Sequence, residues 1–355
     1  MPDARATSAG RAERLAARAL GRLPAWLQLR LSGQPQIVVD EQRLDPQVQL
    51  LLALHRKRRP HGLCHPNPPQ ARARFRRDIL ATTGPLTPVG TVRDLELPGA
   101  GVPLRARHYA PPVSVDQHCD LLVYLHGGGF VIGDLDTHDE PCRLLCRHAA
   151  THVLSVAYRL APEHPFPAAL DDTLAALRWA QDNAAALGAQ TARVALGGDS
   201  AGANLATVAA RRAARAGHPP AAQLLIYPAT DAATPRASQE LFGAGFFLDR
   251  ADCDAFFHHY TAGTGVADDD PRVSPLRARD HSWLPPTLLV TAGFDVLRDE
   301  GEAYAAALRA AGTPVRSRRF PALGHGFINM TGVAPAARQA TIEIAHAWRA
   351  LLAAS

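Results

Sequence analysis

The spacing of hydrophobic and polar positions changes along the chain and separates a helical beginning from a strand-rich remainder. Before residue 85, apolar side chains recur at helical spacing in LDPQVQLLLALHRK (44–57), and HPNPP (65–69) interrupts the pattern before ARARFRRDIL (71–80) resumes it. From about residue 91, the segments TVRDLELP and VPLRARHYA alternate apolar and polar positions around a Gly-Ala-Gly turn. This alternation predicts a β-hairpin.

After the hairpin, short apolar runs alternate with helical patterns. The helix expected over 166–188 ends at a glycine, and a last helix is expected over about 335–352. Apolar strands that alternate with helices predict an α/β fold with a mainly parallel sheet covered on both faces. PVRSRRFPAL (314–323) is more polar, which favours an edge strand. The apolar runs are DLLVYLHGGG, HVLSVAYRL, ARVALGG, AAQLLIYPA and PPTLLVTAG.

One long segment, 231–282, does not fit the alternation of strands and helices. An insertion of this length at the end of a strand is typical of a lid or a binding element. We therefore expect two domains: an N-terminal helical cap arm over 1–85 and a catalytic domain over 86–355, with 231–282 as a cap insertion. The insertion contains four phenylalanines that either line a pocket or hold the cap together, with the second role favoured: Phe246, Phe247, Phe256 and Phe257.

Composition and charge narrow the possible partners and the compartment. The 355 residues are 47% apolar and contain no run of about 18 apolar residues, so we expect no membrane anchor and no secretory signal. Residues 1–80 carry 15 Lys and Arg against 6 Asp and Glu. We favour a solvated helical face over a nucleic-acid or membrane surface, because aromatic residues are sparse there. Five irregularly spaced cysteines predict buried thiols in the cytoplasm and exclude a disulfide framework.

The stretch ALGGDSAGANLA (195–206) lies between an apolar run and a helical pattern, where a glycine-rich turn either cradles a phosphate or holds a nucleophile. A phosphate loop needs a lysine and a serine or threonine after its last glycine, and none follows Gly202 here. Asp199 would also repel a phosphate. The segment 198–202 instead matches G-x-S-x-G between a strand and a helix. This context predicts Ser200 as a nucleophile on a strained turn.

A serine nucleophile needs a base and an acid that orients the base, in the chain order Ser, Asp, His for this class of turn. Asp295 follows the strand PPTLLVTAG, and His325 follows the next strand in a loop between two glycines. Asp299 is the rival acid, but it falls about one helical turn later. His346 is the rival base, but it lies inside the last predicted helix.

An acyl-transfer site also needs N–H groups that stabilise the oxyanion. Ala201 follows the nucleophile, and HGGG (126–129) follows the apolar run LLVYL. Glycines let the backbone approach a substrate closely. We therefore expect the N–H groups of Gly127, Gly128 and Ala201 to form the oxyanion hole.

Taken together, HGGGF (126–130), YRLAPEHPFPAALDD (158–172), GGDSAGANLA (197–206) and DVLRDEG followed by HGF resemble the hormone-sensitive-lipase-like branch of the α/β-hydrolases. The resemblance covers roughly 90–350. It implies an α/β-hydrolase fold with an eight-stranded, mostly parallel sheet and a helical cap. It implies hydrolysis of short- to medium-chain acyl esters through an acyl-enzyme, with a Ser200, His325 and Asp295 triad.

The resemblance also implies that no metal or other cofactor takes part. Glu163 and Asp171 are implied to be structural, tying their loop to the sheet. Val296 departs from the family, which often has proline after the acid. A small-molecule acyl ester is the expected partner, with a possible homodimer through the edge strand and no nucleic acid. Two alternatives stay open: a catalytically weak ligand-binding module, or an amidase or lactonase that uses the same triad.

Overall fold

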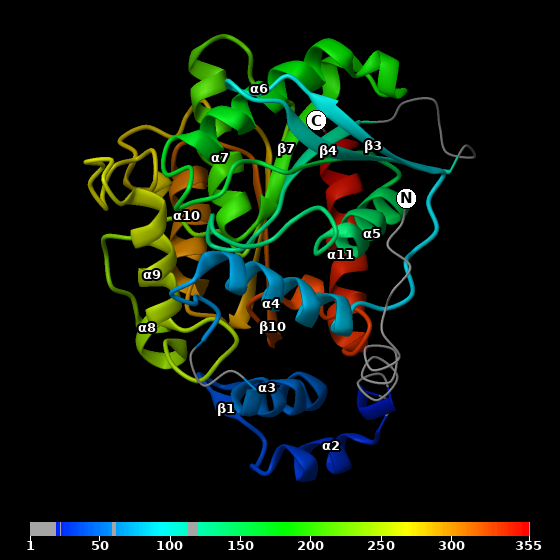
Figure 1. Ribbon diagram of the computed structural model, residues 1–355, viewed down its shortest axis with the longest axis vertical. Helices are drawn as coiled ribbons and strands as arrows, with labels where there is room; N and C mark the ends of the chain where they lie inside the picture. The colour runs from blue at the N-terminus through cyan, green and yellow to red at the C-terminus, as the bar shows by residue number, and fades with distance from the viewer. Residues whose placement is uncertain (1–18, 22, 59–61, 113–119, 355) are drawn as a thin grey trace.

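The structure, a computed structural model, describes residues 19–21, 23–58, 62–112 and 120–354. Within them an eight-stranded sheet runs through the molecule in the order β10-β9-β8-β7-β5-β6-β4-β3 (Figure 1). Its strands are β3 (Thr91–Leu97), β4 (Leu104–Ala110), β5 (Leu121–Leu125), β6 (His152–Val156), β7 (Val194–Asp199), β8 (Gln223–Ile226), β9 (Thr287–Phe294) and β10 (Val315–Gly324).

The sheet combines a parallel centre with an antiparallel margin. Strands β6, β5, β7, β8, β9 and β10 pair in parallel, whereas β4 is antiparallel to both β3 and β6. The predicted hairpin is therefore confirmed as β3 and β4. The prediction of an edge strand is also confirmed, because β10 ends the sheet. Pairing of two copies along this edge stays a prediction.

Helices cover both faces of the sheet because successive strand residues point to opposite sides. On β5, Leu121, Val123 and Leu125 join one buried core, whereas Leu122 and Tyr124 join the other. One face is covered by α6 (Ala168–Asn183), α7 (Ala201–Arg215) and α10 (Arg298–Ala310), and the other by α5 (Asp139–Ala149) and α11 (Pro335–Leu352). The 3-10 turns are η1 (Ala185–Leu187), η2 (Thr191–Arg193), η3 (Pro275–Arg277) and η4 (Phe327–Asn329).

Two segments far apart in sequence meet beyond the carboxyl ends of the parallel strands, in the lower half of Figure 1. The first segment contributes α2 (Ala25–Ser32), α3 (Pro46–Arg58) and α4 (Pro68–Thr82), with the short strands β1 (Val38–Val39) and β2 (Gln42–Arg43). The second contributes α8 (Ala237–Phe242) and α9 (Arg250–Thr261). None of the described helices is long and apolar enough to cross a membrane.

The HPNPP interruption becomes the start of α4. The Asn67 side chain accepts a hydrogen bond from the Gln70 N–H at 3.1 Å, and Pro68 occupies the first helical position. A side-chain oxygen at the cap and proline directly after it are typical of a helix N-terminus. The four described cysteines, 64, 142, 146 and 253, form no disulfide, while Cys119 lies outside the described residues.

Candidate active site

The sharp turn between β7 and α7 holds Ser200 in a strained backbone conformation, with φ 54° and ψ −120°. A positive φ is unfavourable for a residue with a side chain, and such strain persists only where the surroundings enforce it. Gly198 and Gly202 make the turn possible, because a Cβ at either would lie within 2.2 Å of the Leu125 carbonyl oxygen. The turn and the start of α7 behind it thus match the sequence prediction.

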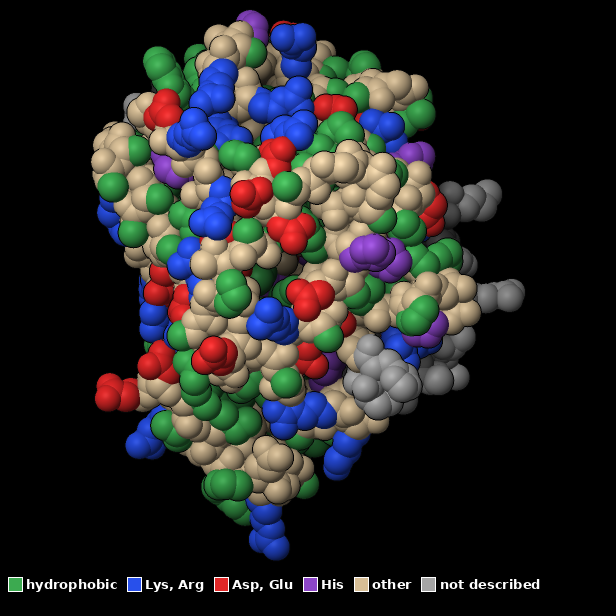
Figure 2. All heavy atoms as spheres, turned by 90° about the vertical axis from the view of Figure 1, so that its left-hand side faces the viewer, with side chains coloured by type: hydrophobic (Ala, Val, Ile, Leu, Met, Phe, Trp, Pro, Cys, Tyr) green, Lys and Arg blue, Asp and Glu red, His purple; other side chains and the backbone are tan. Residues whose placement is uncertain are grey.

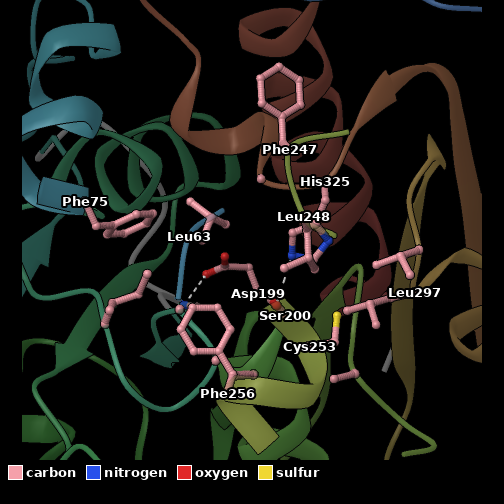
Figure 3. A pocket seen from close by; sticks show the side chains of 18 of the residues that line it. Leu63, Phe75, Asp199, Ser200, Phe247, Leu248, Cys253, Phe256, Leu297 and His325 are labelled. Atoms are coloured by element: carbon pink, nitrogen blue, oxygen red, sulfur yellow. Dashed lines mark hydrogen bonds between the residues drawn. The ribbon is translucent and has the colours of Figure 1, made fainter. Parts of the chain in front are cut away.

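The structure brings Ser200, His325 and Asp295 together from three separate strand ends, and Figure 3 shows Ser200 and His325. The Ser200 Oγ lies 3.0 Å from His325 Nε2, and His325 Nδ1 lies 2.8 Å from Asp295 Oδ2. An ionised carboxylate can only accept, so Nδ1–H donates to Asp295 and leaves Nε2 to accept the serine proton. Asp295 is fully buried, and its second oxygen accepts the Leu297 N–H at 2.9 Å.

The rival residues from the sequence lie in other surroundings. Asp299 accepts the Ser238 N–H at 2.8 Å and pairs with Arg298, so its carboxylate is engaged away from the histidine. His346 lies on α11, with its ring centroid 5.7 Å from that of His148. The arrangement of hydrogen bonds therefore favours Asp295 and His325.

The glycine loop after β5 differs in one respect from the sequence prediction. The Gly127 N–H donates to the Asp199 Oδ1 at 2.9 Å, so Gly127 is not available as an oxyanion donor and that prediction is wrong. Gly128 and Gly129 follow with φ of 122° and 60°, conformations that favour glycine. Together with Ala201, they line the same cavity as Ser200. The sequence alone does not single out Gly129, because a run of glycines does not indicate which of them lines a cavity.

Asp199, the residue before the nucleophile, is a buried carboxylate that holds the glycine loop. Besides the Gly127 N–H, its Oδ1 accepts the Tyr124 hydroxyl at 2.8 Å and lies 3.3 Å from His138 Nε2. Burial alone would raise its pKa, but His138 and these hydrogen bonds together hold the pKa of Asp199 below its usual value. A charged Asp199 therefore joins the turn of Ser200 to the loop before Gly128.

A large cavity of about 1090 Å³ opens above Ser200 and His325. Figure 3 shows Phe75, Leu63 and Phe256 to the left of Ser200, Phe247 and Leu248 above it, and Leu297 to its right. Of the four phenylalanines of the insertion, three line this cavity, whereas Phe246 packs 5.3 Å from the ring of Phe242. The favoured prediction, a cap-holding role for all four, is therefore wrong for three of them.

The sequence profile of the alpha/beta hydrolase fold family matches residues 122–329. The chain belongs to the α/β-hydrolases, in their hormone-sensitive-lipase-like branch. It is 46% identical over 329 residues to "Carboxylic ester hydrolase LipN" of Mycobacterium tuberculosis, covering 91% of this chain and 87% of that protein. It is 38% identical over 283 residues to "Ethyl acetate hydrolase" of Pseudomonas putida, covering 78% and 88%. A solved hyperthermophilic esterase from the archaeon Pyrobaculum calidifontis superposes with a TM-score of 0.80 at 35% identity, covering 86% and 98%.

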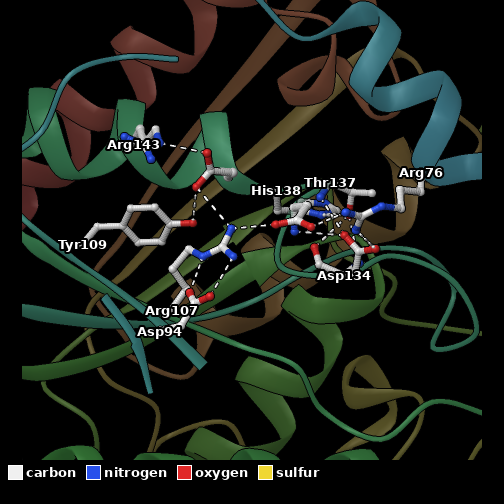
Figure 4. A network of polar contacts seen from close by, with 10 residues as sticks. Arg76, Asp94, Arg107, Tyr109, Asp134, Thr137, His138 and Arg143 are labelled. Atoms are coloured by element: carbon white, nitrogen blue, oxygen red, sulfur yellow. Dashed lines mark hydrogen bonds and ion pairs between the residues drawn. The ribbon is translucent and has the colours of Figure 1, made fainter. Parts of the chain in front are cut away.

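In this α/β-hydrolase, arginines of α4 attach the N-terminal segment to the body. The Arg76 guanidinium pairs with Asp134 at 2.6 Å and with Asp136, in the loop that leads to His138 (Figure 4). Arg107 reaches the same loop by pairing with Asp136 at 2.7 Å. Some of the basic side chains of residues 1–80 therefore form ion pairs within the molecule. Neither the solvated helical face nor the nucleic-acid or membrane surface considered from the sequence included such ion pairs.

Two residues that the resemblance marked as ties to the sheet have different roles in this α/β-hydrolase. Glu163 pairs with Arg72 of α4 at 2.6 Å, so it connects its loop to the N-terminal segment. Asp171 is half-exposed on α6, and its carboxylate lies 3.4 Å from an arginine of α7. The buried carboxylate is its neighbour Asp172, which accepts the Arg159 N–H at 2.9 Å and pairs with the Arg159 guanidinium at 2.7 Å. The expected tie to the sheet is therefore wrong for both residues, although each forms an ion pair within the molecule.

A second buried carboxyl, Glu300, lines the cavity beyond the triad. It accepts the Thr230 N–H at 2.6 Å and the Asp231 N–H at 3.2 Å. Burial raises its pKa from 4.5 to about 8, against the effect of these two hydrogen bonds. Glu300 is therefore mainly protonated at neutral pH and joins the start of the insertion to α10. Among the described residues, no three His, Cys, Asp or Glu side chains are arranged to hold a metal ion.

Proposed function

We propose that the protein is a serine carboxylesterase that hydrolyses short- to medium-chain acyl esters through an acyl-enzyme. The observation that carries this proposal is the continuous line of hydrogen bonds from Ser200 through His325 to Asp295, of 3.0 and 2.8 Å, at the base of a large cavity. The names of the related proteins, which are carboxylic ester and ethyl acetate hydrolases, support the same class of reaction.

In the proposed reaction, the Ser200 Oγ attacks the ester carbonyl while His325 Nε2 takes its proton. The bond from carbonyl carbon to the alcohol oxygen then breaks, and His325 returns the proton to the departing alcohol. A water molecule, deprotonated by His325, releases the acid from Ser200. Asp295 keeps the imidazole oriented and stabilises its charged form. The N–H groups of Gly128, Gly129 and Ala201 stabilise the oxyanion, where one donor is typically worth about 10²–10³ in rate.

The two segments that meet above the strand ends are proposed to act together as a cap that selects the acyl group. Leu63 and Phe75 belong to the N-terminal segment, whereas Leu248 and Phe256 belong to the insertion, and all four line the cavity. Burial of one methylene is worth about 0.8 kcal/mol, so an apolar wall of this kind favours esters with longer acyl chains over acetyl esters. A volume near 1090 Å³ accommodates chains of medium length.

Ser200→Ala tests the proposal directly. We expect kcat for p-nitrophenyl butyrate to fall by about 10⁴-fold or more, because the acyl-enzyme cannot form. Ser282→Ala, at an exposed serine outside the cavity, is the matched control and should keep the wild-type rate. A phosphonate ester should label Ser200 alone in peptide mass spectra. Near-normal hydrolysis by Ser200→Ala would refute the proposal, and a panel of anilides and lactones would separate esterase from amidase or lactonase activity.

A further inference from the structure

A second hollow, of about 510 Å³, lies at the opposite end of α7 from Ser200. A helix rises 1.5 Å per residue, so Arg211 and Arg215 lie roughly 16 Å or more along the axis from the nucleophile. The hollow is therefore separate from the esterase cavity. Four of the side chains that line it are arginines and only one is a carboxylate: Phe166, Pro167, Asp171, Arg211, Arg212, Arg215 and Arg272.

Arg211 is the unusual member of this group, because only 9% of it is exposed. Its Nη2–H donates to the Pro271 carbonyl at 2.8 Å, and within the described residues no carboxylate forms an ion pair with it. A buried charge is normally paired, since its removal from water is costly. The carboxyl end of α7 offsets a part of this cost through its dipole. The carboxylate that attracts Arg211 is Asp270, which is already paired with Arg272, so the two arginines share one counter-charge.

The other charges around the hollow leave an excess of positive charge. Arg272 pairs with Asp270 at 2.7 Å, and Arg212 lies 3.4 Å from Asp171, so two carboxylates engage two arginines. Arg215 lies four residues after Arg211, hence on the same face of α7, and the part of the chain that the structure describes offers it no ion pair either. Like charges at this spacing repel each other, unless an anion lies between them.

The surface shows the same excess of positive charge. Arginine side chains gather at the top of Figure 2, the end of the molecule at which α6 and α7 lie in Figure 1. One wall of the hollow is apolar, because Phe166 and Pro167 form it, and the Arg272 guanidinium lies 5.2 Å from the centroid of the Phe166 ring. Guanidinium groups recognise phosphate by paired hydrogen bonds. Several arginines beside an aromatic ring therefore suit the phosphoryl group of a small organic molecule.

We propose that this hollow is a binding site for a phosphate-class oxyanion, held by Arg211 and Arg215 with Arg212 and Arg272 at its rim. The site does not depend on the esterase reaction. Its ligand chemistry is the same for free phosphate, for a phosphorylated small molecule and for the headgroup of an acidic phospholipid. The anion would supply a counter-charge that the buried guanidinium does not have to share with Arg272.

Calorimetric titration of the full chain with inorganic phosphate at constant ionic strength tests the site. We expect saturable binding below about 10 mM, and Arg215→Gln should weaken it by about tenfold, the typical effect of one charge-assisted hydrogen bond. Arg211→Gln should weaken it at least as much, with circular dichroism to establish that the variant is folded. Arg147→Gln, at an exposed arginine in the last turn of α5, is the matched control and should bind like the wild type.

Sedimentation with vesicles of phosphatidylcholine, with and without phosphatidic acid, separates the sources of the ligand. If the protein sediments only with vesicles that contain phosphatidic acid, and Arg215→Gln but not Arg147→Gln abolishes this, the result would assign the site to a lipid headgroup. Binding of dissolved phosphate with the same dependence would assign it to a soluble ligand. Absence of binding in both experiments, or equal losses in the Arg215 and Arg147 variants, would overturn the proposal.

Discussion

Replacement of Asp199 by alanine tests whether this buried carboxylate positions the oxyanion loop or only stabilises the fold. Within the described part of the chain, Asp199 forms no hydrogen bond with Ser200 or His325. Its oxygens face Gly127, Tyr124, His138 and the hydroxyl of Tyr227. It is therefore expected to act through the glycine loop. The substitution removes the only acceptor recorded for the Gly127 N–H among the described residues and leaves that group buried.

The expected size of the effect follows from these contacts. A buried hydrogen-bonding group without a partner costs about 1–3 kcal/mol, so the Gly127 N–H and the Tyr124 hydroxyl together should lower the free energy of unfolding by roughly 2–6 kcal/mol. A displaced loop would also misplace the N–H groups of Gly128 and Gly129. Because one oxyanion donor is worth about 10²–10³ in rate, kcat should fall by that factor while KM changes little.

Steady-state kinetics with p-nitrophenyl butyrate and urea denaturation measure the two effects separately. Asp199→Asn keeps an oxygen that can accept the Gly127 N–H, so we expect it to retain kcat within about tenfold of the wild type. Asp254→Ala removes an exposed carboxylate of the same cavity and is the control for charge. A destabilised Asp199→Ala that keeps the wild-type kcat would refute a positioning role and leave only a structural one.

Three further variants test other parts of the structure. Phe256→Ala should enlarge the cavity and raise kcat/KM for decanoyl over butyryl esters by about tenfold, the gain from burying roughly two further methylenes at about 0.8 kcal/mol each, whereas Phe246→Ala should leave the ratio unchanged. The pKa of Glu300 rises from 4.5 to about 8 on folding, so between pH 4.5 and 8 the unfolded chain binds fewer protons than the folded chain. The free energy of unfolding therefore falls as the pH rises through this range, by up to about 1.4 kcal/mol per pH unit from this carboxyl. Glu300→Gln should therefore flatten the pH dependence of urea unfolding, and an unchanged slope would contradict the raised pKa. Asp172→Ala should lower the free energy of unfolding by about 3–5 kcal/mol because it leaves its arginine partner without a counter-charge, whereas the half-exposed Asp171→Ala should cost about 1 kcal/mol or less.

The three residues that meet at the candidate active site could be found from the sequence because each is marked locally. Each of Ser200, Asp295 and His325 follows a strand, and the carboxyl ends of parallel strands lie at one edge of the sheet. Distance from the strand end then separates Asp295 from Asp299, since the first follows β9 directly and the second falls within the first turn of α10. Local sequence and sheet topology together are therefore sufficient to place these side chains near one another.

The direction of individual groups could not be found in this way, because it depends on contacts between distant residues. Gly127 is indistinguishable from Gly129 by residue type, and only the Asp199 carboxylate, 72 positions away, decides which N–H is engaged. Asp171 and Asp172 are adjacent and identical, but the phase of α6 points one to solvent and buries the other. A shift of one position on a helix rotates a side chain by about 100°, a difference beyond the accuracy of sequence-based helix boundaries.

The roles of the arginines could not be found from the sequence either, because they too depend on contacts between distant residues. A basic segment was expected to face solvent, yet Arg72 and Arg76 of α4 form ion pairs with carboxylates of the body. Arginines at the end of α7 would likewise be explained from sequence as favourable charges at a helix C-terminus. That explanation suffices for Arg212, which is exposed and has a carboxylate nearby. It does not suffice for Arg211, because burial without an ion pair turns a favourable charge into one that needs an anion.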